Sequence, residues 1–87
     1  LFFEDIHETP AHIERFLYQL QMAGKLQACA GFLIGNSPWD TAADPPENYL
    51  ELAEVYRELL APLGKPCVYG WPNGHDPSPM TMPIGID

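Results

Sequence analysis

The sequence predicts an α/β fold, a small and mostly parallel sheet with two covering helices. Short apolar runs of strand length alternate along the chain with stretches whose apolar residues recur at helical spacing. The resulting order is strand, helix, strand, helix, strand, which is typical of parallel strands joined by helical crossovers. A length of 87 residues allows one domain with a modest core, which we expect to span residues 1–87.

The first strand and the first helix lie at the start of the chain. Leu1–Phe3 is an apolar run that ends at two carboxylates, as a short strand would. Thr9 then offers an N-cap with Pro10 at the first helical position, and Gly24 supplies a C-terminal stop. The stripe expected to face the core comprises Ile13, Phe16, Leu17, Leu20 and Ala23.

The second strand is expected at Ala28–Ile34, which is apolar throughout, as a strand buried on both faces would be. A second helix should begin at Asp44, because Glu47 completes a capping box with it and Pro45 occupies the first helical position, and should end at Leu63-Gly64. Its outer face is acidic, and its expected inner stripe comprises Leu50, Ala53, Tyr56, Leu59 and Leu60. The third strand is expected at Cys67–Tyr69, closed by Gly70, and a last extended piece at residues 81–84.

The charge balance excludes several classes of partner. Four basic against twelve acidic residues give a net charge of -8, which repels phosphate backbones and anionic lipid surfaces. We therefore expect no nucleic-acid partner and no membrane partner. Cys29 and Cys67 stand in apolar contexts, so we expect buried free thiols in a reducing compartment and a cytoplasmic protein.

Polar residues follow each predicted strand. Glu4 follows the first strand, Asn36 the second and His75 the third. Parallel strands end at one edge of a sheet, and ligands usually bind in the crevice outside those ends. A carboxylate and a histidine at one edge match the orienting acid and the general base of a nucleophilic hydrolase, so Glu4 and His75 are the candidate catalytic residues.

Other candidate sites fit their chemistry less well. His7 and His12 are five residues apart around Pro10, so they would not share the helix face that a zinc-protease motif requires. Ser37 lacks the Gly-x-Ser-x-Gly frame of a nucleophile elbow. The cysteines lie within predicted strands, where a nucleophile would be hard to reach. We therefore expect no metal and no cofactor.

Two stretches together, "LFFEDIHETPAHIERFLYQL" and "GWPNGHDPSPMTMPIG", resemble the C-terminal domain of the LD-carboxypeptidases, a family that also includes microcin C self-immunity proteins. The resemblance covers essentially the whole chain. It implies a serine peptidase with a Ser-Glu-His triad that removes a terminal D-amino acid from murein tetrapeptides during wall recycling. The family's glutamate falls on Glu4 and its Gly-His histidine on His75.

The resemblance also implies that the serine and the oxyanion-hole amides belong to an N-terminal domain that this chain lacks. The first residue is Leu and the chain opens inside a predicted strand, so we expect a part of a longer, two-domain enzyme that is inactive by itself. The sequence departs from the family at His12 and Glu14 on the helix and at Asp76. Asp76 is the notable change, since a carboxylate beside His75 could raise its pKa or compete with Glu4 for its proton.

Three alternatives stay open at the level of sequence. Pro79-Met80-Thr81 and Pro83-Ile84-Gly85 favour the microcin-immunity branch, whose substrates are aminoacyl adenylate analogues. A non-enzymatic acidic α/β interaction module is the second alternative, and completion of the triad by Ser37 is the third. The expected partners are a murein peptide or related small peptide, the missing domain, and a second copy paired through Leu1–Phe3.

Overall fold

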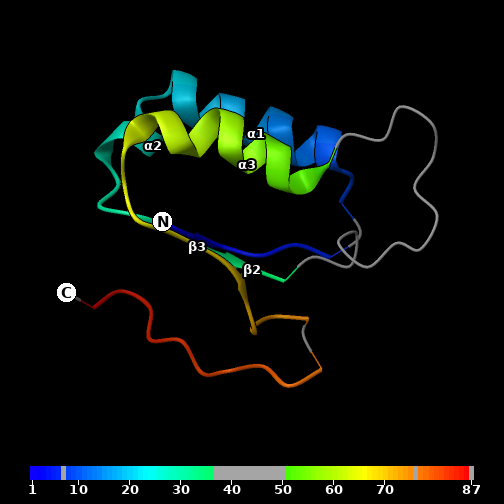
Figure 1. Cartoon of the computed structure of the whole chain (residues 1–87). Helices are drawn as coiled ribbons and strands as arrows, with labels where there is room; N and C mark the ends of the chain where they lie inside the picture. Colours follow the sequence, from blue (N-terminus) through cyan, green and yellow to red (C-terminus); the bar gives the residue numbers. More distant parts are fainter. Residues whose placement is uncertain (7, 37–50, 76, 87) are drawn as a thin grey trace.

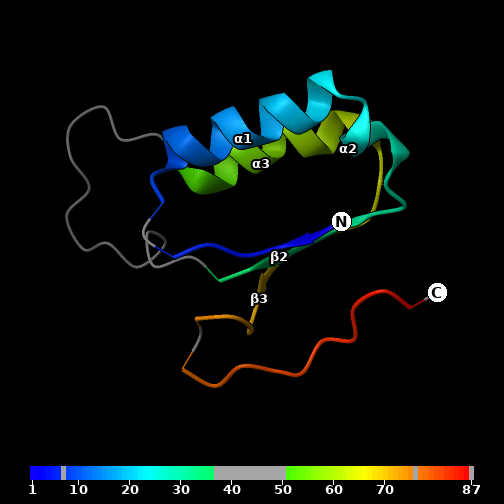
Figure 2. The same ribbon diagram turned by 180° about the vertical axis from the view of Figure 1, so that it is seen from behind.

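The computed structural model describes residues 1–6, 8–36, 51–75 and 77–86. Within them, β1 (Phe2–Phe3), β2 (Phe32–Gly35) and β3 (Cys67–Trp71) form a parallel sheet in the order β1-β2-β3. Helices α1 (Pro10–Met22) and α3 (Leu52–Leu60) both lie on one face of this sheet (Figure 1). The segment after β3 runs along the opposite face, as the view from behind also shows (Figure 2). The predicted α/β class is therefore confirmed.

Helix α1 begins and ends where the sequence predicts. The Thr9 hydroxyl accepts a hydrogen bond from the backbone N–H of His12 at 3.3 Å, and Pro10 follows as the first helical residue. After the helix, Gly24 adopts a left-handed conformation with φ 73°. That conformation reverses the chain direction at little cost for glycine.

The buried stripe of α1 is narrower than predicted. Ile13 and Leu17 are buried and Leu20 is half-buried, but Phe16 is 42% exposed and Ala23 is exposed. Ile13 and Leu17, four residues apart, belong to the core cluster with α3, whereas Phe16 lines a groove between β1 and α1 and stays partly exposed. The prediction of Phe16 and Ala23 as core residues is wrong for this reason.

The predicted strand at Ala28–Ile34 begins later than expected. A short helix, α2 (Lys25–Ala28), occupies its first residue, and β2 starts only at Phe32. All four residues that follow Gly24 have good helical propensity, and the Lys65 ammonium donates hydrogen bonds to the carbonyls of Gln27 and Cys29 at the end of this turn. The ammonium group of a residue distant in sequence thus stabilises a helical turn, although the apolar pattern around Ala28 predicts a strand.

Helix α3 buries five residues at spacings of three and four. Its inner face comprises Leu52, Val55, Tyr56, Leu59 and Leu60. Ala53, predicted for this face, is exposed, because it lies one position off that periodicity. The predicted end is confirmed, since a 3-10 turn (η2, Ala61–Leu63) stops at Gly64 with φ 65°. The predicted start of this helix is wrong, because Glu51 is extended with ψ 131° and α3 begins only at Leu52. The predicted cap at Asp44 and the predicted core residue Leu50 lie outside the described residues.

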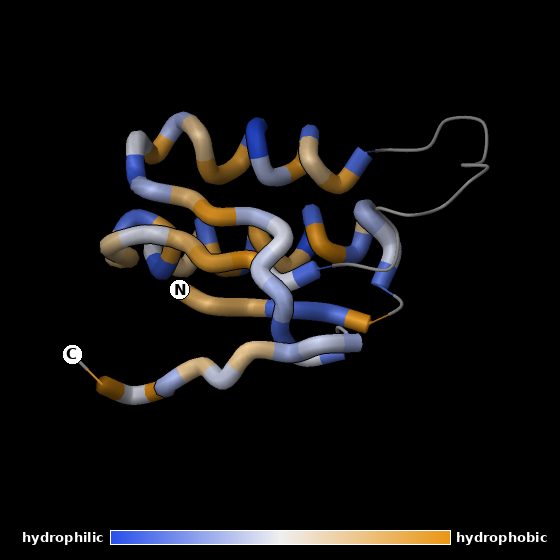
Figure 3. The backbone as a smooth tube through the Cα atoms, turned by 60° about the horizontal axis from the view of Figure 1, so that its bottom comes forward, coloured by the Kyte–Doolittle hydropathy of each residue, from blue (hydrophilic) through white to orange (hydrophobic). Residues whose placement is uncertain are grey.

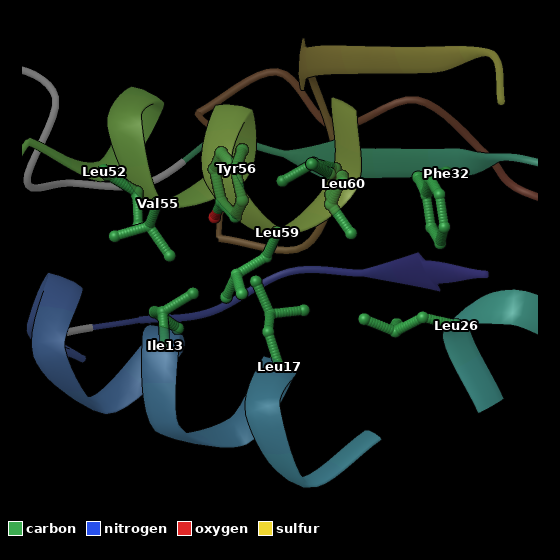
Figure 4. Close-up of a cluster of buried hydrophobic side chains, with 10 residues drawn as sticks. Ile13, Leu17, Leu26, Phe32, Leu52, Val55, Tyr56, Leu59 and Leu60 are labelled. Atoms are coloured by element: carbon green, nitrogen blue, oxygen red, sulfur yellow. The ribbon is translucent and has the colours of Figure 1, made fainter. Parts of the chain in front are cut away.

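The core fills the layer between the sheet and the helices (Figure 4). Alternate strand residues point toward that layer, and the ring of Tyr56 contacts Phe3 at a centroid distance of 5.8 Å and Tyr69 at 5.3 Å. Leu26 from α2 is fully buried at one end of it. Side chains from both edge strands therefore meet on α3, which ties the sheet to its covering helices.

Three smaller expectations need correction. Cys67 is exposed and Cys29 is half-buried, because Cys67 belongs to an edge strand and Cys29 follows α2 rather than lying in a strand. β3 continues through Gly70 to Trp71. Residues 81–84 form no strand within the described part of the chain. In that same part, no helix is long and apolar enough to cross a bilayer.

The strand order places β1 at an edge of the sheet, with β2 as its partner on one side. The expected pairing of two copies through Leu1–Phe3 requires such an edge. The homodimer itself stays a prediction.

Truncation of a core side chain should test the packing described above. Leu60 is 1% exposed and lies between α3 and β2, so Leu60→Ala should lower the free energy of unfolding by about 2–5 kcal/mol. Met22→Ala is the matched control, because Met22 is 79% exposed and its truncation should change stability by less than about 0.5 kcal/mol. Urea denaturation of both variants measures the difference, and equal effects would contradict this description of the core.

Candidate active site

The carboxyl ends of the three strands supply the residues of the candidate site. Glu4 follows β1 directly, Gly35 is the last residue of β2, and residues 72–75 follow β3. In Figure 3 the trace of β1 changes from apolar to hydrophilic colouring as the strand ends. The predicted meeting of these segments at one edge of the sheet is confirmed.

A bulge in β3 directs the chain toward the site. Ile34 pairs with Tyr69 but Gly35 pairs with Trp71, so Gly70 is an extra residue, and its φ of 78° suits only glycine comfortably. The backbone N–H of Asn36 donates to the carbonyl of Trp71 at 3.1 Å, which keeps the two strand ends together beyond the bulge. The bulge increases the local twist and turns the following residues across the end of β2.

The segment after the bulge forms a closed loop. The backbone N–H of Met80 donates to the carbonyl of Pro72 at 2.7 Å, which ties the start of the C-terminal segment to the end of β3. Gly74, with φ 65°, supplies the turn immediately before the histidine. Prolines at 72, 77 and 79 restrict the backbone on both sides of that turn. His75 is thus carried on a conformationally restricted segment.

His75 and Glu4 are joined by a side-chain hydrogen bond across the sheet edge. The distance from His75 Nδ1 to Glu4 Oε2 is 2.9 Å, and the two residues are 71 positions apart in the sequence. With Glu4 as a carboxylate, Nδ1 carries the proton and donates it. The Nε2 atom receives no hydrogen bond from the described residues, so it is the ring nitrogen that could accept a proton from a nucleophile.

A second histidine–glutamate pair provides a comparison within the same chain. His12 Nδ1 lies 2.8 Å from Glu8 Oε2, in an i,i+4 arrangement at the start of α1. Both of these side chains are well exposed, whereas Glu4 is 27% exposed. The Glu8–His12 pair joins residues that are close in sequence at the start of α1, while the Glu4–His75 pair requires the complete fold.

An apolar groove adjoins the Glu4–His75 pair. It has a volume of about 420 Å³ and lies between β1 and α1. Its apolar lining includes Ile6, Phe16 and Leu20, and its polar lining comprises Glu4, Asp5, Glu8 and His75. The pair therefore borders a concave surface that could hold another molecule or another part of a longer chain.

Asn73 is a buried polar residue in the turn that the sequence-based site prediction did not single out. It is 8% exposed, and its Oδ1 accepts no hydrogen bond from the described residues. Pro72-Asn73-Gly74 is a typical turn sequence, which is the one signal that could have marked the residue.

Other candidate groups do not form a second site in the part of the chain that the structure describes. No cluster of potential metal ligands is found among those residues. Ser37, Asp76 and His7 lie outside them. Although Cys67 is exposed as a residue, partial burial of its thiol raises its pKa, which disfavours the thiolate that a nucleophile needs. Cys29 donates its thiol to the carbonyl of Lys25 at 3.2 Å.

One known protein family matches this chain over its whole length. Residues 1–87 match the model of the LD-carboxypeptidase C-terminal domain. The chain belongs to this family. The predicted resemblance is thereby confirmed, and with it the placement of the chain among carboxypeptidase domains.

Curated and structural relatives agree with this family. The chain is 36% identical over 85 residues to a Bacillus subtilis protein named as a murein peptide carboxypeptidase, of which it covers 26%. It is 33% identical over 83 residues to a Streptomyces coelicolor protein named as a carboxypeptidase, of which it covers 25%. The crystal structure of muramoyltetrapeptide carboxypeptidase from Oxalobacter formigenes matches 98% of the chain with a TM-score of 0.79 and 32% identity, over 29% of that structure. The LD-carboxypeptidase domain thus spans about a quarter of the length of these relatives.

The raised pKa of Cys67 predicts slow alkylation. At pH 8 its thiolate fraction should be lower than that of a free cysteine, so iodoacetamide should modify it more slowly. Mass spectrometry of the chain and of Cys67→Ser, which retains Cys29 alone, separates the two thiols. Modification of Cys67 faster than free cysteine would contradict the prediction and make this thiol a candidate nucleophile.

Proposed function

We propose that this domain is the C-terminal part of a serine-type LD-carboxypeptidase and that Glu4 and His75 are two members of its Ser-Glu-His triad. The observation that carries the proposal is the 2.9 Å hydrogen bond between the two residues that the family resemblance assigns to these roles. The nucleophilic serine and the oxyanion-hole amides would belong to the N-terminal domain of the longer protein.

The geometry suits a general base with an orienting acid. Glu4 holds the proton of His75 on Nδ1, which leaves the lone pair of Nε2 available. In the proposed reaction, Nε2 takes the serine proton as the serine oxygen bonds to the scissile carbonyl carbon. It then gives that proton to the departing amine as the C–N bond breaks, and Glu4 stabilises the imidazolium between these steps. Water cleaves the acyl-enzyme by the same proton transfers in reverse.

The substrate that we propose is a murein tetrapeptide, from which the enzyme releases the terminal D-amino acid. The names of the Bacillus subtilis and Oxalobacter formigenes relatives support this class of substrate. Recycling of wall peptides of this kind would take place in the cytoplasm, and the free thiols of Cys29 and Cys67 are compatible with that reducing compartment.

Substitution of either triad residue should abolish turnover in the full-length protein. His75→Ala should lower kcat for release of D-alanine from a murein tetrapeptide by about 10⁶-fold, and Glu4→Gln by about 10⁴-fold. His75 is half-exposed and Glu4 lies at a strand end, so both variants should keep the circular dichroism spectrum of the unsubstituted protein.

The Glu8–His12 pair supplies the control for these variants. His12→Ala removes a histidine with the same kind of carboxylate partner, on the first turns of α1. Its turnover should stay within about threefold of the unsubstituted protein, because the His12 ring is exposed and bonds to Glu8 rather than to Glu4, and such exposed pairs contribute about 0–1 kcal/mol to stability. Full activity of both His75→Ala and Glu4→Gln would refute the proposed roles, and cleavage of an aminoacyl adenylate analogue in place of the tetrapeptide would refute the substrate.

A further inference from the structure

We propose that Gly74 is a positioning residue for the Glu4–His75 pair: the missing side chain at this position leaves the space in which the Glu4 carboxylate lies. This inference rests on the proposed function, since it concerns the same pair. It adds a residue that neither the sequence motifs nor the family assignment explains in physical terms.

The contacts around Gly74 show why a side chain cannot be added there without displacing Glu4. A Cβ atom on Gly74 would lie 2.4 Å from Cδ and 2.4 Å from Oε2 of Glu4. These separations are far below van der Waals contact, and Oε2 is the atom that accepts the hydrogen bond from His75. The Glu4 carboxylate therefore occupies the volume of the side chain that residue 74 does not have.

Gly35 bounds the same space from the end of β2. A Cβ atom at this buried residue would lie 2.7 Å from Cβ of Glu4, and 3.5 Å from Oδ1 of Asn73. Glu4 therefore passes between two glycines on separate elements, with its stem against Gly35 and its carboxylate against Gly74. This close fit restricts the rotamers of Glu4 and keeps Oε2 within reach of His75.

A side chain added at Gly35 would disturb a different part of the molecule from one added at Gly74. At Gly35 the obstructing atom is close to the backbone of β1, so an added side chain would have to move the strand. At Gly74 the obstructing atoms are the far end of a flexible side chain, which can rotate away. Gly74→Ala should therefore leave the fold intact and break the Glu4–His75 hydrogen bond.

Gly64 offers a matched control for backbone strain. Gly64 and Gly74 both have φ 65°, so alanine incurs the same left-handed conformation at either position. Apart from its chain neighbours, no atom of the described residues lies within 4 Å of a Cβ built on Gly64. The two variants share the strain and differ in the collision with Glu4.

The decisive measurement is the tautomer of His75 in the 87-residue chain, read from the ¹⁵N chemical shifts of its ring at a pH where the ring is neutral. The unsubstituted chain and Gly64→Ala should show the proton held on Nδ1, and Gly74→Ala should show the tautomer mixture of a free imidazole. The denaturation midpoints of the two variants should be similar. Retention of the Nδ1–H tautomer in Gly74→Ala would overturn the proposal.

A second background keeps the test valid if Gly74→Ala does not fold. Glu4→Ala removes Cγ, Cδ and Oε2, the atoms that the new side chain would meet. In the Glu4→Ala background, Gly74→Ala should lower the free energy of unfolding no more than Gly64→Ala does. The proposal would be overturned if Gly74→Ala destabilised the protein equally with and without the Glu4 side chain, and in both cases well beyond Gly64→Ala.

Kinetics of the full-length protein separate this proposal from the proposed function. Gly74→Ala should lower kcat by about 10²–10⁴-fold with little change in KM, whereas Gly64→Ala should not. If Gly74→Ala loses the Nδ1–H tautomer of His75 but the unsubstituted full-length protein has no peptidase activity, the proposed function is refuted and the role of Gly74 is supported. Full activity of Gly74→Ala in a working peptidase would refute the role of Gly74 alone.

Discussion

The segment that carries His75 must cross the end of β2 to reach Glu4, and the geometry of the site depends on that crossing. β1 and β3 lie on opposite sides of β2, so the histidine must span about 10 Å of sheet edge after leaving its own strand. The bulge at Gly70 turns the chain in that direction, and Gly35 lets the crossing segment and the Glu4 side chain approach the end of β2 closely. The Glu4–His75 hydrogen bond then joins the end of the crossing segment to the residue that follows β1.

The two histidine–glutamate pairs show how position rather than residue type determines a chemical role. Both have donor–acceptor distances close to 2.9 Å. One joins Glu8, just before α1, to His12 on the first turn of that helix, and both side chains are exposed, so the pair contributes little to stability. The other joins two strand ends beside an apolar groove, and the orientation of its ring is set by elements far apart in sequence. In the proposed mechanism, the second pair is the one whose ring nitrogen transfers the proton.

Consecutive residues at the end of β1 serve the hydrophobic core and the candidate site, because side chains alternate between the two faces of a strand. Phe3 points toward α3 and contacts Tyr56, so the next residue, Glu4, lies at the strand end with its side chain beside the glycines. Packing on the helix side therefore fixes the position from which the carboxylate projects. The domain spans about a quarter of the length of its relatives. The groove beside Glu4 and His75 lies on the surface of the described part of the chain.

Much of this protein follows from its sequence, because local patterns carry the relevant physics. The cap at Thr9, the stops at Gly24 and Gly64, the strand–helix alternation and the pairing of Glu4 with His75 at one sheet edge all follow from capping, periodicity and parallel topology. The tertiary structure alone decided that residues 25–28 are helical, since the stabilising cation comes from Lys65. It also decided that Phe16 stays partly exposed, since burial depends on which neighbours a helix face meets. It also decided which atoms surround the Glu4 carboxylate, because the close approach of Gly35 and Gly74 joins segments that no local pattern connects.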